Sequence, residues 1–275
     1  MKLKLALASS LLVAALGWAG PAGAQLKATD NPEASVAWKK VRGDLFAAKP
    51  IVAAPEDMME IDAPPRAEDA SIVPIGIKMH FPQSAGRYVS KMYLIIDNNP
   101  SPVAAVIRFT PISGRADLET RVRIDEYTHV RAVAEMNDGN LFMTTKFVKA
   151  AGGCSAPSAR NQAAAMASLG KIKFRVEGDA GSDRPMLAQL LISHPNNSGL
   201  AMDPVSKAFV PANFVRNVNI TYAGQPVMSA DLDNSISENP NLRFYFVPQG
   251  VGELKAEIVD SNDLRFQSTV SVSKL

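Results

Sequence analysis

Short runs of β-branched and aromatic residues, separated by turn-forming residues, constrain the fold of this chain more than any other feature. In the first half these runs predict strands over 72–79, 89–97, 103–109, 118–124, 128–134 and 141–148. In the second half they predict strands over 172–177, 186–193, 214–221, 227–231, 242–247, 252–260 and 265–272. So many short strands at this spacing are typical of antiparallel sandwiches. We therefore expect an all-β chain with two β-sandwich domains in tandem.

One short helix is expected before the first strand. Asn31 is a good N-cap residue, Pro32 suits the first helical position, and Glu33 places a negative charge in the first turn. Apolar residues then recur at helical spacing, namely Trp38, Val41 and Leu45. We expect an amphipathic helix over 32–47, packed on the side of a sheet, and a loop over 53–65, where proline and acidic residues are frequent.

The first residues have the pattern of an export signal. Lys2 and Lys4 precede an apolar run over 5–17, and small residues at 22–24 form a cleavage pattern before Gln25. We expect a signal peptide over 1–24 and a periplasmic protein. The sequence after it contains no apolar run of the roughly 18 residues that a membrane helix needs, so no membrane partner is expected.

The balance of charges excludes one large class of partners. The 29 basic residues, less Lys2 and Lys4, equal the 27 acidic residues, so the expected mature chain is formally neutral. A neutral chain has no electrostatic footprint for nucleic acid, and none is expected as a partner. The strand pattern divides the chain into domains at 25–150 and 171–275, joined by an alanine- and glycine-rich linker over 151–170.

The linker contains Cys154, the one cysteine of the chain. In an oxidising compartment a single cysteine forms no internal disulfide, which leaves intermolecular pairing, a buried thiol or a reactive thiol. Gly152 and Gly153 precede it, and small residues follow, so we expect an exposed thiol on a flexible arm that fits a narrow cleft. Lys149 and Arg160 are the nearest charges in sequence, and they would lower the thiol pKa modestly if they lay close.

Motifs of autonomous chemistry are absent from the sequence. Its three histidines, His80, His129 and His194, are scattered without metal-ligand spacing, and no haem-attachment, nucleophile-elbow or phosphate-loop motif occurs. We therefore expect no metal, no cofactor and no catalytic activity. From the residues alone, two interpretations stay open: Cys154 carries a covalent group, or it is incidental in an ordinary linker.

Several segments resemble a known carrier system. The segment 148–154, which ends in Gly152, Gly153 and Cys154, resembles the carrier arm of the SoxY subunit of the bacterial sulfur-oxidation system. Further similarity to SoxY lies at 67–74, 96–100, 109–111 and 130–135. The second half is similar to the partner subunit SoxZ, through 192–195, 198–200, 210–214 and 237–240.

The resemblance implies immunoglobulin-like folds in both halves and a fused SoxYZ-like carrier, of the type that accompanies quinoprotein dehydrogenases. It also implies that Cys154 holds a sulfur intermediate, with thiosulfate as its source, that a c-type cytochrome loads, and that a hydrolase later releases sulfate. One departure is that the SoxY cysteine lies near a free tail, whereas here the chain continues into the second half.

Two alternatives to the carrier remain open at this stage. The first is a periplasmic accessory module of a quinoprotein dehydrogenase system, with no covalent cargo. The second is a homodimer linked through Cys154. A sulfur-containing adduct on the thiol would separate the carrier from both.

Overall fold

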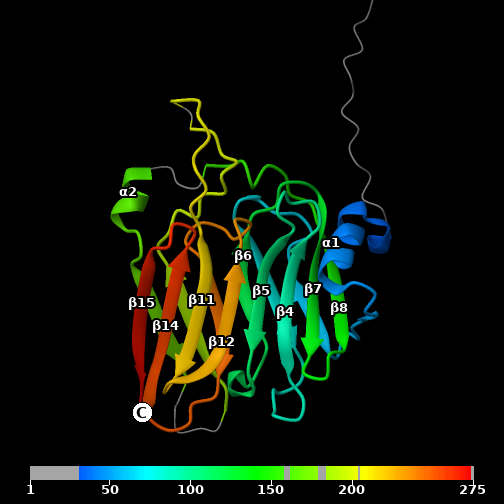
Figure 1. The fold of residues 1–275 in the computed structure, drawn as a ribbon, viewed down its shortest axis with the longest axis vertical. Coiled ribbons are helices and arrows are strands. Elements are labelled where there is room, and N and C mark those ends of the chain that lie inside the picture. The colour runs from blue at the N-terminus through cyan, green and yellow to red at the C-terminus, as the bar shows by residue number, and fades with distance from the viewer. Residues whose placement is uncertain (1–30, 158–161, 179–183, 204, 274–275) are drawn as a thin grey trace, which may run out of the picture.

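The computed structural model describes residues 31–157, 162–178, 184–203 and 205–273 (Figure 1). The expected signal peptide at 1–24 lies outside these residues. Within the described part of the chain, no helix has both the length and the apolar character needed to cross a membrane.

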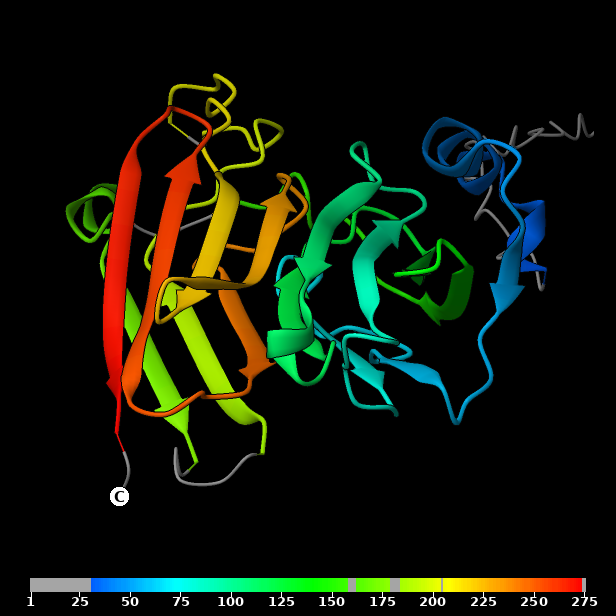
Figure 2. The ribbon, with the colours of Figure 1, turned by 60° about the horizontal axis from the view of Figure 1, so that its bottom comes forward.

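In the part of the chain that the structure describes, fifteen strands form two sheets that pack face to face (Figure 2). The nine-stranded sheet has the order β1-β8-β7-β4-β5-β12-β11-β14-β15, and the six-stranded sheet has the order β2-β3-β6-β13-β10-β9. The strands of the first half are β1 (Ile51–Ala53), β2 (Met59–Asp62), β3 (Val73–Met79), β4 (Val89–Ile96), β5 (Val103–Phe109), β6 (Leu118–Val122), β7 (Thr128–Met136) and β8 (Leu141–Val148). Those of the second half are β9 (Ile172–Glu177), β10 (Met186–Ile192), β11 (Val215–Tyr222), β12 (Gln225–Leu232), β13 (Asn241–Phe246), β14 (Gly252–Asp260) and β15 (Arg265–Val272).

Both sheets run without a break from one half of the chain into the other. In the nine-stranded sheet β5 pairs antiparallel with β12, with Ile107 opposite Ala230. In the six-stranded sheet β6 pairs antiparallel with β13, with Leu118 opposite Phe244. The all-β class and the two sandwich-like halves in tandem are confirmed, and the halves share their sheets rather than meeting only at a linker.

The core lies between the two sheets and is also shared. Alternate residues of a strand face opposite sides of a sheet, so the alternation of buried and exposed residues in β3 and β13 places one side of each strand inside. Val73, Ile107 and Phe244, from both halves, belong to one cluster of buried apolar residues. Burying a side chain of this size contributes about 1.5–3 kcal/mol, so the common core holds the halves together.

The N-terminal helix is present but begins later than expected. Asn31 caps a 3₁₀ turn, η1 (Pro32–Ala34), and Ser35 caps the α-helix α1 (Val36–Phe46) by accepting a hydrogen bond from the Trp38 amide. Trp38 and Val41 are buried as expected. The expectation for Leu45 was wrong, because it is 39% exposed and Phe46 takes the buried position.

The expected loop over 53–65 was also wrong in part. It contains β2, which pairs with β3 and places Met59 in the core. Strand β1, which pairs in parallel with β8, was not expected either. Both strands are short, and the alternation of apolar and polar residues is hard to recognise over so few residues.

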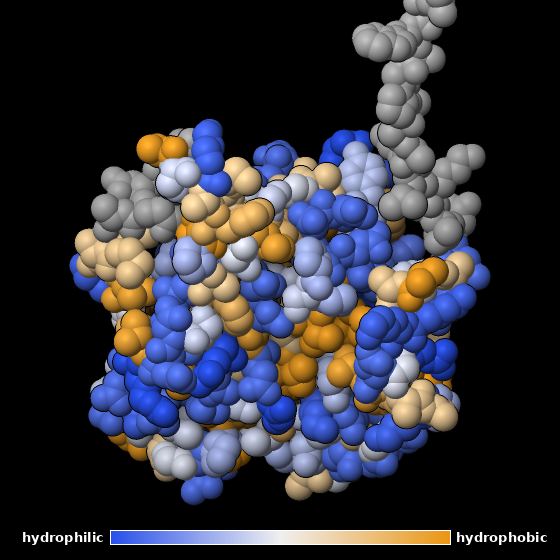
Figure 3. All heavy atoms as spheres, turned by 45° about the horizontal axis from the view of Figure 1, so that its top comes forward, coloured by the Kyte–Doolittle hydropathy of each residue, from blue (hydrophilic) through white to orange (hydrophobic). Residues whose placement is uncertain are grey.

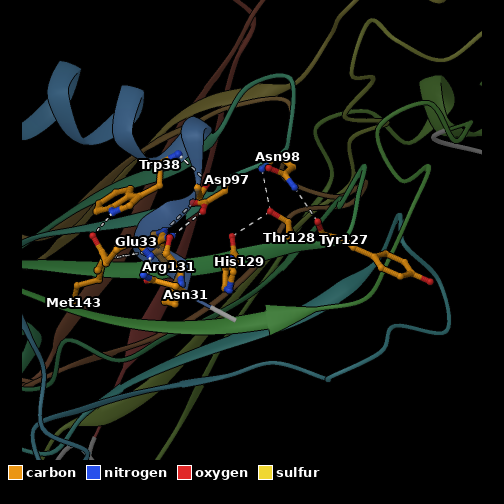
Figure 4. Close-up of polar contacts among 12 residues, drawn as sticks. Asn31, Glu33, Trp38, Asp97, Asn98, Tyr127, Thr128, His129, Arg131 and Met143 are labelled. Atoms are coloured by element: carbon orange, nitrogen blue, oxygen red, sulfur yellow. Dashed lines mark hydrogen bonds and ion pairs between the residues drawn. The ribbon is translucent and has the colours of Figure 1, made fainter. Parts of the chain in front are cut away.

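Helix α1 is fixed to the outer face of the nine-stranded sheet by a buried arginine (Figure 4). Arg131 on β7 donates two hydrogen bonds of 2.8 Å to the Asp97 carboxylate and one of 2.6 Å to the Pro32 carbonyl. Its guanidinium lies 4.4 Å from the centre of the Trp38 ring. Trp38 in turn donates to Glu33 at 3.0 Å. The cluster therefore joins helix, strand and strand end in one network.

Candidate functional site

Cys154 lies in the segment 151–157, which follows β8 and which we call the arm. Its side chain is buried, with 2% of its surface exposed. The Cys154 carbonyl accepts a 2.5 Å hydrogen bond from the Ser198 hydroxyl, which belongs to the second half of the chain. The expectation of an exposed thiol on a free arm is therefore wrong for this structure, in which the arm is docked.

The two glycines of the arm are needed for close packing. A Cβ on Gly153 would lie 2.0 Å from the Ala70 carbonyl oxygen and 2.7 Å from the Ile124 carbonyl oxygen. Gly152 has a φ of 80°, which disfavours residues with a side chain. The amides of Gly152 and Gly153 donate to the carbonyls of Asp125 and Ile124 at 2.8 and 2.9 Å. In the docked arm these glycines thus allow a close approach, whereas the sequence suggested flexibility.

Arg123 lies under the arm and reaches both halves of the chain. Its side chain is fully buried and donates to the Gly153 carbonyl at 3.5 Å and to the Asn196 carbonyl at 3.1 Å. Its amide donates to the Ser235 carbonyl at 2.7 Å. Sequence reasoning missed Arg123, because an arginine in a strand-like run is usually exposed.

A chain of buried polar groups supports Asn196 from the second half. The His194 Nδ1 accepts a 3.0 Å hydrogen bond from the Asn196 amide, and its Nε2 lies 3.5 Å from the Asp260 carboxylate. Asn196 also donates through its side chain to the Ile236 carbonyl at 2.9 Å. Burial lowers the pKa of His194, which favours the neutral ring that can accept from Asn196. Asn196, whose carbonyl accepts from Arg123, is therefore itself held by buried hydrogen bonds to His194 and Ile236.

The docked position suppresses the reactivity of the thiol. Burial, followed by the charge of Asp125, raises the pKa of Cys154 from 9.0 to about 12, and Arg123 opposes the shift. At a pH below both pKa values, this increase reduces the thiolate fraction about a thousandfold. Since the thiolate is the nucleophile, Cys154 must leave this position to react. The sequence pointed to Lys149 and Arg160, but Asp125 and Arg123 act on the thiol here, and Arg160 lies outside the described residues.

This pKa shift predicts how the reactivity of Cys154 depends on pH. A thiol with a raised pKa keeps its proton in the docked arm, so docking is at full strength below pH 9.0, the ordinary thiol pKa, and weakens as the pH rises towards about 12. We expect the rate of alkylation by iodoacetamide to keep rising above the ordinary thiol pKa. In the protein unfolded by urea it should level off there. Quenched alkylation read by intact mass between about pH 8 and about pH 11 measures this, and a common plateau in both samples would contradict it.

The other two histidines contact residues outside the arm. His80 is partly exposed beside Glu60, and His129 packs edge-on against Phe147. Among the residues that the structure describes, no three His, Cys, Asp or Glu side chains are grouped to hold a metal ion.

A groove of about 540 Å³ crosses the outer face of the six-stranded sheet. Residues of both halves line it, among them Gly76, Arg121 and Gln189. It does not include Cys154 or the residues that hold the arm. Its lining also includes the charged side chains of Asp62, Lys78 and Glu119.

A hairpin beside the arm carries exposed apolar side chains. The loop after β10 folds back on itself, with Met202 opposite Phe209. It projects from the same end of the sandwich as the arm, and Figure 3, which looks onto that end, shows hydrophobic residues among hydrophilic ones around it. The exposed apolar residues of this hairpin are Leu200, Met202, Val205 and Phe209. Ser198 at its base donates to Cys154 and accepts from the Leu200 amide at 3.2 Å.

Comparison with known families divides the chain at the arm. Residues 42–154 match the family model of the sulfur oxidation protein SoxY, and residues 172–271 match that of the sulphur oxidation protein SoxZ. The chain carries a SoxY domain followed by a SoxZ domain. This tandem supports a fused SoxYZ-like carrier in sulfur oxidation, with partners among the enzymes of that process. The SoxY match ends at Cys154, so it includes the arm as far as its cysteine.

Solved structures resemble the chain only distantly. The sulfur carrier protein SoxY from Chlorobium limicola f thiosulfatophilum is 20% identical, with a TM-score of 0.35, over 41% of this chain and 90% of that one. A superoxide reductase (neelaredoxin) from Ignicoccus hospitalis is 15% identical, with a TM-score of 0.30, over 34% of this chain and 79% of that one. Likeness at this level carries no argument about function. No curated protein matches the chain.

Proposed function

We propose that this SoxYZ-like protein is an exported, non-catalytic carrier that holds a sulfur-derived group covalently on Cys154 while partner enzymes modify it. The observation that carries the proposal is the docking of the arm. The last residue of the SoxY match is held by Ser198 of the SoxZ domain, beside the buried Arg123 that joins both domains. A linker with an incidental cysteine has no need of such a binding position.

The docked and undocked arm would have different tasks. In the docked arm the thiol is protonated and shielded, which protects it from oxidation outside the cytoplasm. When the arm undocks, the thiol regains an ordinary pKa and its thiolate can attack or be attacked. Each hydrogen bond that holds the arm contributes about 0.5–1.5 kcal/mol, so a partner enzyme can compensate for their loss.

The expected partners fit this division of work. Joining a thiolate to a second reduced sulfur atom removes two electrons, which a c-type cytochrome would accept. A hydrolase would then release the oxidised sulfur as sulfate. The proposal includes thiosulfate as the source of the cargo, a periplasmic location and an association with a quinoprotein dehydrogenase system. The likeness of segment 148–154 to a SoxY carrier arm supports thiosulfate as the source.

Replacement of Cys154 tests the proposal. We expect Cys154→Ser, expressed in the native host, to fold as the wild type does and to carry no sulfur-containing adduct. Serine is close to cysteine in size, so the docked arm should be retained. The matched control is Ser155→Ala, which changes the exposed neighbour and should load normally. Intact-protein mass under non-reducing conditions measures loading, and an adduct of equal yield on Cys154→Ser would exclude this attachment site.

The accessory-module alternative has one observation in its favour, which is the burial of Cys154. In that case the thiol packs between the domains and carries nothing. The same experiment separates the two, because the accessory function should survive Cys154→Ser. A homodimer linked through Cys154 would appear as a reductant-sensitive band of double mass on a gel, and it requires the arm to undock.

A further inference from the structure

The docked position of the arm suits an uncharged sulfur. Cys154 is buried together with the backbone of Gly153, whose amide and carbonyl are both engaged. A charge in such a place loses its hydration, and burying an ion without a matched partner is strongly unfavourable. Therefore the state of the sulfur atom should decide whether the arm docks.

The charged groups around the thiol do not compensate for an added negative charge. Asp125 lies in the loop between β6 and β7, and its negative charge opposes an anion on Cys154. The positive charge of Arg123 favours such an anion, but its effect on the thiol is smaller than that of Asp125. Arg123 already donates to two carbonyls and also faces the carboxylates of Glu238 and Asp69. An anion on the sulfur would thus be buried near the carboxylate of Asp125. The guanidinium of Arg123 would compensate for it only in part, because it already interacts with other acceptors.

We propose that the arm docks when Cys154 is a free thiol and undocks when its sulfur carries an anionic group, so that loading itself releases the arm to the processing enzymes. This inference rests on the proposed function, because it concerns the cargo on the same thiol. An intermediate that ends in a sulfonate, from which sulfate can be hydrolysed, has the required charge. The unloaded arm then stays shielded, and the loaded arm is presented.

Charged and neutral adducts of similar size test the switch in the purified full chain. A methanethiosulfonate reagent transfers its thiol group to the Cys154 thiolate, forming a disulfide and releasing methanesulfinate, while the thiol proton goes to solvent. One sample receives the anionic sulfonatoethyl group, a second the neutral hydroxyethyl group, and a third keeps the thiol. Intact mass confirms complete modification. Hydrogen exchange of the Gly152 and Gly153 amides then reports docking, since both donate to backbone carbonyls in the docked arm.

We expect the arm amides of the anionic adduct to exchange at least about tenfold faster than those of the thiol and of the neutral adduct. Asp125→Asn should reduce this excess several-fold, because it removes the carboxylate that opposes the anion. Glu126→Gln changes the exposed neighbour and should leave the excess unchanged. Both side chains lie outside the core, so both variants should fold. The comparison of the three wild-type samples tests the inference even without these variants.

Equal protection in all three samples would overturn the inference, and so would equal loss of protection in both adducts, since charge would then play no part. Neither result bears on the carrier function, which the mass of the loaded protein tests. Conversely, if no adduct were ever found on the protein in its host, the carrier function would be refuted. The response of the arm to charged and neutral labels could still be as inferred.

Discussion

Replacing Gly153 by alanine is expected to undock the arm and to raise the alkylation rate of Cys154 at neutral pH by about tenfold to a hundredfold. The new Cβ would lie 2.0 Å from the Ala70 carbonyl oxygen. A backbone oxygen in a paired segment cannot withdraw cheaply, because Ala70 accepts from the Ile124 amide at 2.8 Å. Overpacking of this kind costs about 1–3 kcal/mol, which corresponds to that range of rates.

The measurement is quenched alkylation with iodoacetamide, followed by intact mass. Gly86→Ala is the matched control, because nothing lies within 4 Å of a Cβ at that position and the rate should not change. The melting temperature of Gly153→Ala should stay near that of the wild type, since the arm lies outside the two sheets. A rate equal to the wild-type rate would show that the docked arm does not control the thiol.

Replacing Arg131 by methionine is expected to lower the free energy of unfolding by about 3–5 kcal/mol. The substitution leaves Asp97 buried without its cation, and it removes the bonds that hold η1 and the ring of Trp38 to the sheet. For a domain of this size the melting temperature should fall by about 6–20 °C, as measured by calorimetry. The fall should come with release of α1, which trypsin would then cleave.

Two further variants make this prediction specific. Lys40→Met breaks the ion pair with Asp44, in which both side chains are exposed, and should change the melting temperature little. Adding Asp97→Asn to Arg131→Met should recover part of the loss, because the uncompensated buried charge is removed. If Arg131→Met had the melting temperature of the wild type, the cluster around Arg131 would not be what fixes α1 to the sheet.

All strands except β1 and β2 were predictable, because each is a run of five or more residues rich in β-branched and aromatic side chains and bounded by turn residues. The bounds of β5, β8, β9, β14 and β15 agree with the sequence prediction. Asp97 and Arg131 fall within the predicted strands 89–97 and 128–134, but their burial was not predictable, since it depends on a helix and a strand end meeting in space. The continuity of the sheets across the halves was not visible either, because pairing such as that of β5 with β12 links residues more than a hundred positions apart.

The site was predictable only in part. The arm residues Gly152, Gly153 and Cys154 stand out by composition, and the family matches account for their position. The docked state depends on Arg123 and Ser198, which come from a strand-like run and from a loop of the other half. Local sequence favours a flexible arm, whereas the tertiary contacts of Gly153 with Ala70 and Ile124 fix its backbone.

The most direct test of the carrier is the mass of one peptide from protein isolated from its native host without reductant. Trypsin cleaves after Lys149 and Arg160, which isolates Cys154 in residues 150–160. The account predicts a fraction of this peptide with a sulfur-containing addition on Cys154 that reductant removes. A peptide found only as the free thiol, while the host is oxidising sulfur, would contradict it.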